Sequence, residues 1–164
     1  MSENLNELPT FLVPLQKRSM LVPEATVAEI ISYEPLQRVQ NTADWFLGFL
    51  AWRGVQVPVV SFEMLTVERA SFSLMSVSSA SLVVIRAPRM TGDIEYIALV
   101  SQSLPSLVRI HPTELTESGE KVERTELMKV RYGEEVLSIP NLDYIESKIC
   151  SVAFADEEKS PNLA

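Results

Sequence analysis

The sequence holds few of the residues that carry metal and nucleophile chemistry. Its 164 residues include one cysteine, Cys150, and one histidine, His111. A single cysteine cannot close an intramolecular disulfide, which suits a reducing compartment, and a single histidine cannot build a zinc site of several histidines. The five glycines never cluster, so no glycine-rich loop is available to cradle a phosphate. We therefore expect no catalytic residues, no metal site and no cofactor.

Positive charge and long apolar runs are also scarce. The chain has 14 lysines and arginines against 22 aspartates and glutamates, with a formal net charge of -8. Nucleic acids and anionic membranes bind clustered positive charge, so this balance argues against both as partners. No window approaches the roughly 18 apolar residues of a membrane span, and the N-terminus lacks the pattern of a signal peptide. We expect a cytoplasmic protein without direct membrane insertion.

What the chain does have is a series of short apolar and β-branched runs separated by turn residues. Strands this short and this closely spaced are typical of small β-barrels rather than of a parallel sheet. Residues 62–70 and 142–149 favour short helices, residues 1–10 a flexible N-terminus, and residues 150–164 a polar acidic tail. The predicted strands are residues 11–15, 20–22, 26–32, 47–52, 55–62, 81–86, 94–100, 107–110, 127–130 and 136–139.

Residues 44–62, which read DWFLGFLAWRGVQVPVVSF, form the most informative stretch. An apolar run is followed by Arg53-Gly54 and then by a β-branched run, which predicts two strands joined by a tight turn. Glycine at position 54 supplies the positive φ that such turns require. Gly48, inside the first strand, indicates a bulge or a close approach of another backbone segment.

Four aromatic residues in this stretch allow two other interpretations. Trp45, Phe49 and Trp52 have the i, i+4, i+7 spacing of a helical stripe, although Gly48 and the following β-branched run favour a strand. Together with Phe46, they could also line the pocket of a small ligand-binding sensory barrel. Aromatic residues at this spacing more often form a core.

Two charged residues lie in otherwise apolar strands or beside them. Glu29 is set into residues 26–32, and Arg53 occupies the predicted turn. An isolated buried charge costs several kcal/mol, so each side chain either faces water or has a partner. The two could meet or form a polar pair at an interface, and the spacing does not decide between these arrangements.

Two polar segments interrupt the strand pattern. The serine-rich residues 71–81 predict a loop. The acidic residues 114–126 predict a second loop, whose glutamates form either a solvated face or a metal-binding or interaction surface. These glutamates are Glu114, Glu117, Glu120, Glu123 and Glu126.

The motif VAEI at residues 27–30, with G-x4-RG-x3-PV at residues 48–59, resembles the CheW-like family. This family comprises the coupling proteins of bacterial chemosensory arrays. The resemblance covers residues 11–149, which we assign to a CheW-like domain. It implies two small five-stranded SH3-like β-barrels packed together, with short helices. It also implies a non-enzymatic adaptor that couples the cytoplasmic tip of methyl-accepting chemoreceptors to the regulatory domain of a CheA-type histidine kinase.

The resemblance further implies which residues form the binding surfaces. Glu29 and Arg53 become a charged pair near these surfaces, with apolar positions that support or contact the partner. Glycines at two positions hold the backbone shape. The implied residues are Glu29, Arg53, Val27, Ile30 and Val59 for partner binding, and Gly48 and Gly54 for structure.

The chain departs from the family pattern in its second half. Many family members have Val-Asp where this chain has Val100-Ser101, so a negative charge is missing there. The sequences around Asp44-Trp45 and around residues 51–54 resemble the branch associated with type IV pilus (twitching) chemosensory systems.

Overall fold

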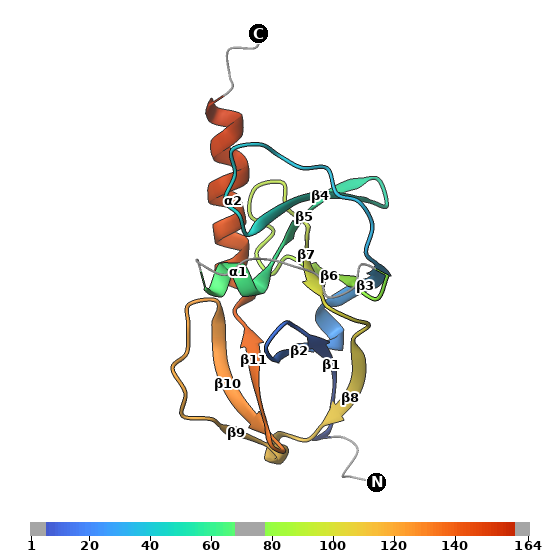
Figure 1. Cartoon of the computed structure of the whole chain (residues 1–164), viewed down its shortest axis with the longest axis vertical. Coiled ribbons are helices and arrows are strands. Elements are labelled where there is room, and N and C mark those ends of the chain that lie inside the picture. Colours follow the sequence, from blue (N-terminus) through green and yellow to red (C-terminus); the bar gives the residue numbers. More distant parts are fainter. Residues whose placement is uncertain (1–5, 68–77, 160–164) are drawn as a thin grey trace.

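Two β-sheets stacked end to end form the molecule, and one long helix runs along the second sheet (Figure 1). The structure, a computed structural model, describes residues 6–67 and 78–159. The first sheet has the strand order β8-β1-β2-β11-β10-β9, and the second has the order β3-β6-β7-β5-β4. The mainly β fold with two subdomains that the sequence predicted is confirmed.

Each sheet is built from short strands. The first contains β1 (Leu8–Pro14), β2 (Ser19–Pro23), β8 (Ser106–Ile110), β9 (Leu115–Glu117), β10 (Glu126–Tyr132) and β11 (Glu135–Pro140). The second contains β3 (Val27–Ser32), β4 (Phe46–Trp52), β5 (Val55–Val60), β6 (Ser81–Arg86) and β7 (Tyr96–Ser101). The helical elements are α1 (Phe62–Thr66), α2 (Leu142–Lys159) and the 3-10 turns η2 (Glu24–Thr26) and η3 (Pro112–Glu114).

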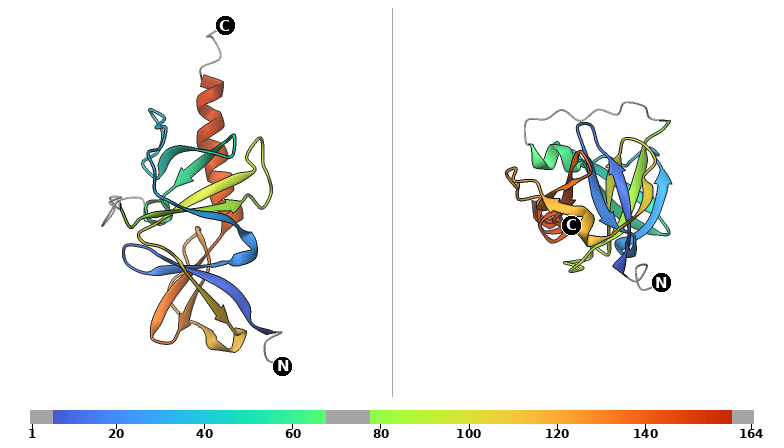
Figure 2. Two further views of the ribbon diagram at one scale, coloured as in Figure 1. Left: turned by 90° about the vertical axis from the view of Figure 1, so that its right-hand side faces the viewer. Right: turned by 90° about the horizontal axis from the view of Figure 1, so that it is seen from below.

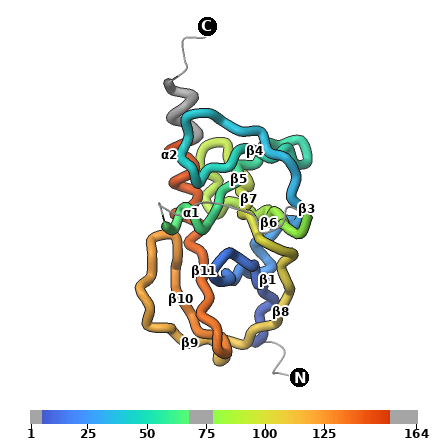
Figure 3. The backbone as a smooth tube through the Cα atoms, viewed as in Figure 1, coloured from blue at the N-terminus to red at the C-terminus, as the bar shows by residue number. Residues whose placement is uncertain are grey.

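The chain begins the first sheet, builds the whole second sheet, and then returns to complete the first (Figure 3). The β1–β2 hairpin therefore joins strands from the far end of the sequence, through β1–β8 pairing and a parallel contact between β2 and β11. In the second sheet β5 and β7 are also parallel neighbours. Because of this path, the first subdomain cannot form from one continuous segment.

Three apolar clusters hold the sheets together. One lies within the first sheet around Val130 and Leu137, and another lies on one side of the second sheet around Leu82 and Val100. The largest joins Val13, Met20 and Val22 of the first sheet to residues of the second sheet and to α2. The two sheets therefore share a core and pack as one body (Figure 2).

The first sheet differs from prediction at two places. It has six strands where five were expected, because β9, inside the polar segment predicted as a loop, pairs with β10 from Val130↔Glu117 to Tyr132↔Leu115. Strand β1 begins at Leu8, inside the stretch assigned to a flexible N-terminus, because Leu8 pairs with Ile110. Both are pairings with distant segments, which local sequence patterns do not report.

Helix α2 is longer than predicted. Its backbone continues from Leu142 to Lys159, whereas the sequence placed the end at residue 149. The segment ADEEK at residues 155–159 consists mostly of good helix formers, which explains the continuation. No helix in residues 6–67 and 78–159 combines the length and apolarity needed to cross a membrane.

Glu146 on α2 is a fully buried carboxylate that the sequence analysis did not single out. Its oxygens accept hydrogen bonds from the backbone N–H groups of Arg89, at 2.9 Å, and Thr91, at 2.6 Å. Burial acts to raise the pKa of Glu146, but these hydrogen bonds, one from the Thr91 side chain and the charge of Arg89 outweigh it, so the pKa lies below the usual value. Glu146 thereby fixes the β6–β7 connection to the helix.

Candidate functional site

The β4–β5 hairpin presents Arg53 at its tip. Trp52 pairs with Val55, so Arg53 and Gly54 are the two residues of the turn, with φ of 48° and 81°. Two positive φ angles define a type I′ turn, whose twist suits a hairpin. The predicted turn is confirmed, and the helical alternative for Trp45, Phe49 and Trp52 is wrong because residues 46–52 form β4.

Gly48 is both a bulge and a point of close backbone approach, as predicted. The β4–β5 register shifts between Phe46 and Gly48. Beside it, Gln37 and Phe49 exchange two backbone hydrogen bonds, of 2.8 Å and 2.9 Å. A Cβ atom at position 48 would lie 2.5 Å from the Gln37 carbonyl oxygen, and the φ of 133° also disfavours other residues.

The charged residues Glu29 and Arg53 meet, which the sequence left open. Strands β3 and β4 are the two opposite edges of the second sheet, yet Glu29 on β3 lies beside the end of β4. Its Oε1 accepts hydrogen bonds from Trp52 Nε1, at 2.9 Å, and from Arg53 Nη2, at 3.0 Å. The sheet has therefore curled until its edges approach, and this side-chain bridge spans the gap between them.

We call Glu29, Trp52 and Arg53 the edge cluster. The Arg53 guanidinium carbon lies 4.6 Å from the centroid of the Trp52 ring, in cation–π geometry. Tyr96 also packs edge-on against that ring, at 4.8 Å between centroids. The indole is thus fixed by the Glu29 acceptor, by Tyr96 and by Arg53.

The edge cluster combines a rigid base with accessible charge. Trp52 is buried, whereas the side chains of Glu29 and Arg53 are 38% and 66% exposed. Val55, just past the turn, is an exposed apolar residue beside them. A rigid tryptophan, an accessible ion pair and an apolar neighbour form a surface suited to recognising a protein.

Of the other residues implied by the resemblance, Val59 lies beneath this surface, whereas Val27 and Ile30 pack on the opposite side of the second sheet from Trp52. Val27 and Ile30 on β3 are half-buried and pack against the core shared by both sheets. Val59 on β5 is fully buried in the cluster that also contains Trp52. Val59 is therefore placed to support the surface from within, while Val27 and Ile30 retain some exposure.

Within the described residues, Trp45 and the aromatic residues of β4 do not line a common pocket. Phe46 packs edge to face against Trp45 and against Phe49, and all three belong to or pack against the shared core. Trp52 belongs to the cluster on the other side of the sheet. This arrangement is that of a core and lends no support to the ligand-pocket interpretation of these four residues.

The acidic segment is largely tied into the fold. Glu114 completes a capping box with His111 at the start of η3, and Glu120 pairs with Arg18 at 3.4 Å. Glu126 is buried and accepts from Ser138 Oγ and the backbone N–H of Glu123. Within the described residues no group of three metal-ligating side chains forms. Most of the serine-rich segment, at residues 71–77, lies outside the described residues, as does the end of the helix predicted at 62–70.

Trp52 is the residue of this site whose role the sequence analysis missed. A buried tryptophan needs an acceptor for its indole N–H, and a lone glutamate in an apolar strand needs a donor. These two complementary needs, at positions 52 and 29, were the available signal.

These features define a mainly β protein of two joined subdomains, with an accessible ion pair beside a buried tryptophan at the edge of the second sheet. The family model of the CheW-like domain matches residues 9–147, and the chain belongs to this family. The crystal structure of scaffolding protein TtCheW from Thermoanaerobacter tengcongensis matches with a TM-score of 0.69 at 9% identity, covering 85% of this chain and 92% of that one. At this identity the likeness shows the fold. No curated protein matches the sequence.

Family membership sets the general role of the chain. CheW-like domains are non-enzymatic scaffolding and adaptor domains of chemosensory signalling, and this domain accounts for most of the chain. The expected CheW-like resemblance is thereby confirmed at the level of the family.

Proposed function

We propose that this protein is a cytoplasmic adaptor that couples methyl-accepting chemoreceptors to a CheA-type histidine kinase. The observation that carries the proposal is the edge cluster, since the family motif residues Glu29 and Arg53 meet at an accessible site on a rigid base. The protein binds the regulatory domain of the kinase and the cytoplasmic tip of the receptor.

The geometry supports a division of labour among the motif residues. Arg53 and Glu29 offer hydrogen bonds to a partner, and Val55 offers apolar area beside them. Val59 supports the surface from within, and Val27 and Ile30 anchor β3 to the core shared by both sheets. Gly48 and Gly54 allow the bulge and the turn that bring Arg53 to Glu29.

Within this role we further propose the branch of type IV pilus (twitching) systems. The support is the sequence around Asp44-Trp45 and residues 51–54. At the departure in the second half, Ser101, where many members have Asp, is fully buried and donates from its hydroxyl to the carbonyl oxygens of Pro14, at 3.3 Å, and Ser103. This difference therefore changes a contact inside the fold.

The test is a pull-down from the native cytoplasm with tagged wild type and Arg53→Ala side by side. We expect the wild type to recover a histidine kinase or a chemoreceptor, and Arg53→Ala to recover less, because an exposed arginine contributes more to binding than to folding. Recovery of partners from a pilus system supports the proposed branch. Recovery of neither partner class by folded wild type contradicts the adaptor role.

A further inference from the structure

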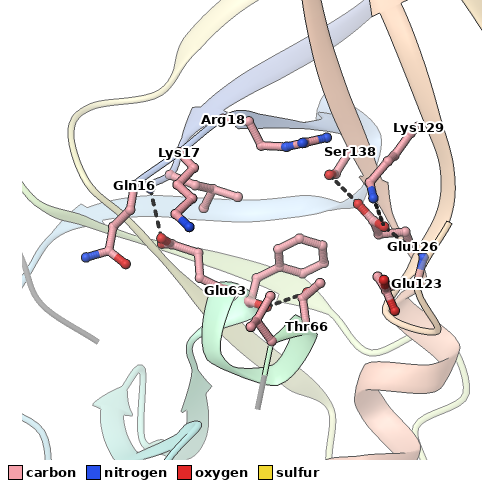
Figure 4. A pocket seen from close by; sticks show the side chains of 12 residues that line it. Gln16, Lys17, Arg18, Glu63, Thr66, Glu123, Glu126, Lys129 and Ser138 are labelled. Carbon is pink, nitrogen blue, oxygen red and sulfur yellow. Dashed lines mark hydrogen bonds and ion pairs between the residues drawn. The ribbon is translucent and has the colours of Figure 1, made fainter. Parts of the chain in front are cut away.

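A cavity of about 230 Å³ lies at the junction of the two subdomains, away from the edge cluster. It is open to solvent and is bordered by the β1–β2 turn, by α1, and by the segment that leads into β10 (Figure 4). Leu15, Phe62 and Val67 contribute apolar lining. Charged side chains surround this apolar part, so the cavity has an apolar wall and a charged rim.

Most of the charged groups around the cavity already have partners. Glu63 Oε2 accepts from the backbone N–H of Gln16 at 2.9 Å. Glu126 accepts from Ser138 and pairs with Lys129 Nζ at 3.4 Å, and Lys129 also donates to the carbonyl oxygen of Lys121. These groups are satisfied by the fold and do not call for a ligand.

Arg18 differs from them. Its Nη2 pairs with Glu120 at 3.4 Å, but its Nη1 is buried and has no hydrogen-bond partner. It is the one side-chain nitrogen or oxygen in that condition within the part of the chain that the structure describes. Figure 4 shows the Arg18 side chain lying across the cavity from Glu63 and Thr66 of α1. A buried donor without an acceptor costs free energy, which an acceptor in the cavity would recover.

We propose that this cavity binds the carboxylate of an apolar organic acid. Arg18 Nη1 donates to the carboxylate, and the apolar body of the acid lies against Leu15 and Phe62. A guanidinium recognises a planar carboxylate well, and the bond is strengthened by both charges. The glutamates that line the cavity disfavour a doubly charged phosphate more than a singly charged carboxylate.

The acid could be a free small molecule or the C-terminal carboxylate of a peptide. The first experiment titrates the ¹⁵N-labelled full chain with 3-phenylpropionate and, separately, with its uncharged amide. We expect saturable shifts at residues 15–18 and 66–67 with the acid alone. Arg18→Gln should weaken binding about tenfold or more, as loss of a charge-assisted hydrogen bond implies. Arg131→Gln removes one positive charge from an exposed position on β10 and should leave binding unchanged.

A second arm uses a short peptide that ends in phenylalanine, with a free or an amidated C-terminus. Tighter binding of the free peptide than of 3-phenylpropionate assigns the site to chain ends, and the reverse assigns it to small acids. If thermal denaturation shows that Arg18→Gln is not folded, Arg18→Lys is used in its place. This variant keeps the positive charge but loses the planar guanidinium, and we expect it to bind the acid more weakly than the wild type does. Absence of saturable binding by both probes, or equal binding of acid and amide, overturns the proposal.

Discussion

Two glutamates of this protein each accept hydrogen bonds from two residues, but they do so in opposite surroundings. Glu29 lies at the surface and accepts from the side chains of Trp52 and Arg53. Glu146 is fully buried and accepts from the backbone N–H groups of Arg89 and Thr91. Both join segments that are distant in the sequence, one across the edges of a sheet and the other between a helix and a strand connection.

The difference shows how to separate fold from function in this chain. A buried carboxylate bound to backbone groups holds those segments in place, because removing it leaves buried N–H donors without an acceptor. An exposed carboxylate paired with an exposed arginine contributes little to stability and remains accessible to a partner. We therefore propose that the edge cluster binds a partner, whereas Glu146 holds the fold.

The largest loss of stability is expected when Glu146 is replaced by alanine. We expect Glu146→Ala to lower the free energy of unfolding by about 3 kcal/mol, since the hydrogen bonds from Arg89 and Thr91 to a charged acceptor are lost inside the protein. Urea denaturation followed by circular dichroism measures this change. A loss no larger than that of Glu29→Ala contradicts the assignment of Glu146 to the fold.

The backbone of the hairpin offers a matched pair of glycines. Gly48→Ala should cost about 2 kcal/mol or more, because the new Cβ meets the Gln37 carbonyl in a strained backbone conformation. Gly54→Ala, which also has positive φ but has no atom within 4 Å of the new Cβ, should cost about 1 kcal/mol. Thermal unfolding of both variants tests the order, and equal losses would show that the close approach at Gly48 is unimportant.

Acid should distinguish Glu146 from its glutamine variant. The folded pKa of Glu146 lies below its ordinary value of 4.5, so near and below pH 4.5 this carboxyl group is protonated to a greater extent in the unfolded chain than in the folded one. The stabilisation is present above 4.5 and is lost as the pH falls through the folded pKa. We expect the stability gap between wild type and Glu146→Gln to narrow from neutral pH to about pH 3.

The wild type and Glu146→Gln share all other carboxylates, so the contributions of these groups to the pH dependence of stability cancel in the difference. Among these is Glu63, whose pKa is raised because burial outweighs its hydrogen bonds with Gln16 and Gln102. Urea denaturation at a series of pH values provides the measurement. A gap that stays constant with pH means that the Glu146 carboxylate is not stabilised in its charged form.

Small effects on stability are expected within the edge cluster. Glu29→Ala removes the acceptor of the buried Trp52 indole and should cost about 1 kcal/mol, whereas Glu29→Gln keeps a carbonyl acceptor and should cost less. Tryptophan emission reports whether the indole loses its environment. Unfolding of Glu29→Gln at ordinary temperature would place Glu29 with Glu146 as a structural residue.

The parts of the fold that depend on local sequence could be predicted. Gly54 predicts the tight turn and Gly48 predicts the bulge, because few other residues adopt those φ angles. Strand β9 was missed because its sequence, LTE, is neither apolar nor alternating, and only the pairing with β10 makes it a strand. The end of α2 was missed because its second half has helix propensity without an apolar stripe.

The candidate site was predictable in its residues but not in its contacts. Glu29 and Arg53 stood out as charges among apolar residues, yet their meeting depends on the curl of a sheet that brings opposite edges together. The burial of Glu146 was not predicted, because glutamate is common on exposed helix faces. Its position beside Ile145 and three residues before Ile149, both buried, was the signal that it lies on the buried stripe of α2.

The most direct test of the central claim is the affinity of the chain for the regulatory domain of a CheA-type kinase from its own organism. Wild type, Arg53→Ala and Arg131→Ala would be compared by calorimetry, with equal melting temperatures confirming that all are folded. We expect Arg53→Ala to bind about tenfold more weakly and Arg131→Ala to bind as the wild type does. Equal affinities of all three proteins would contradict the assignment of the edge cluster to binding.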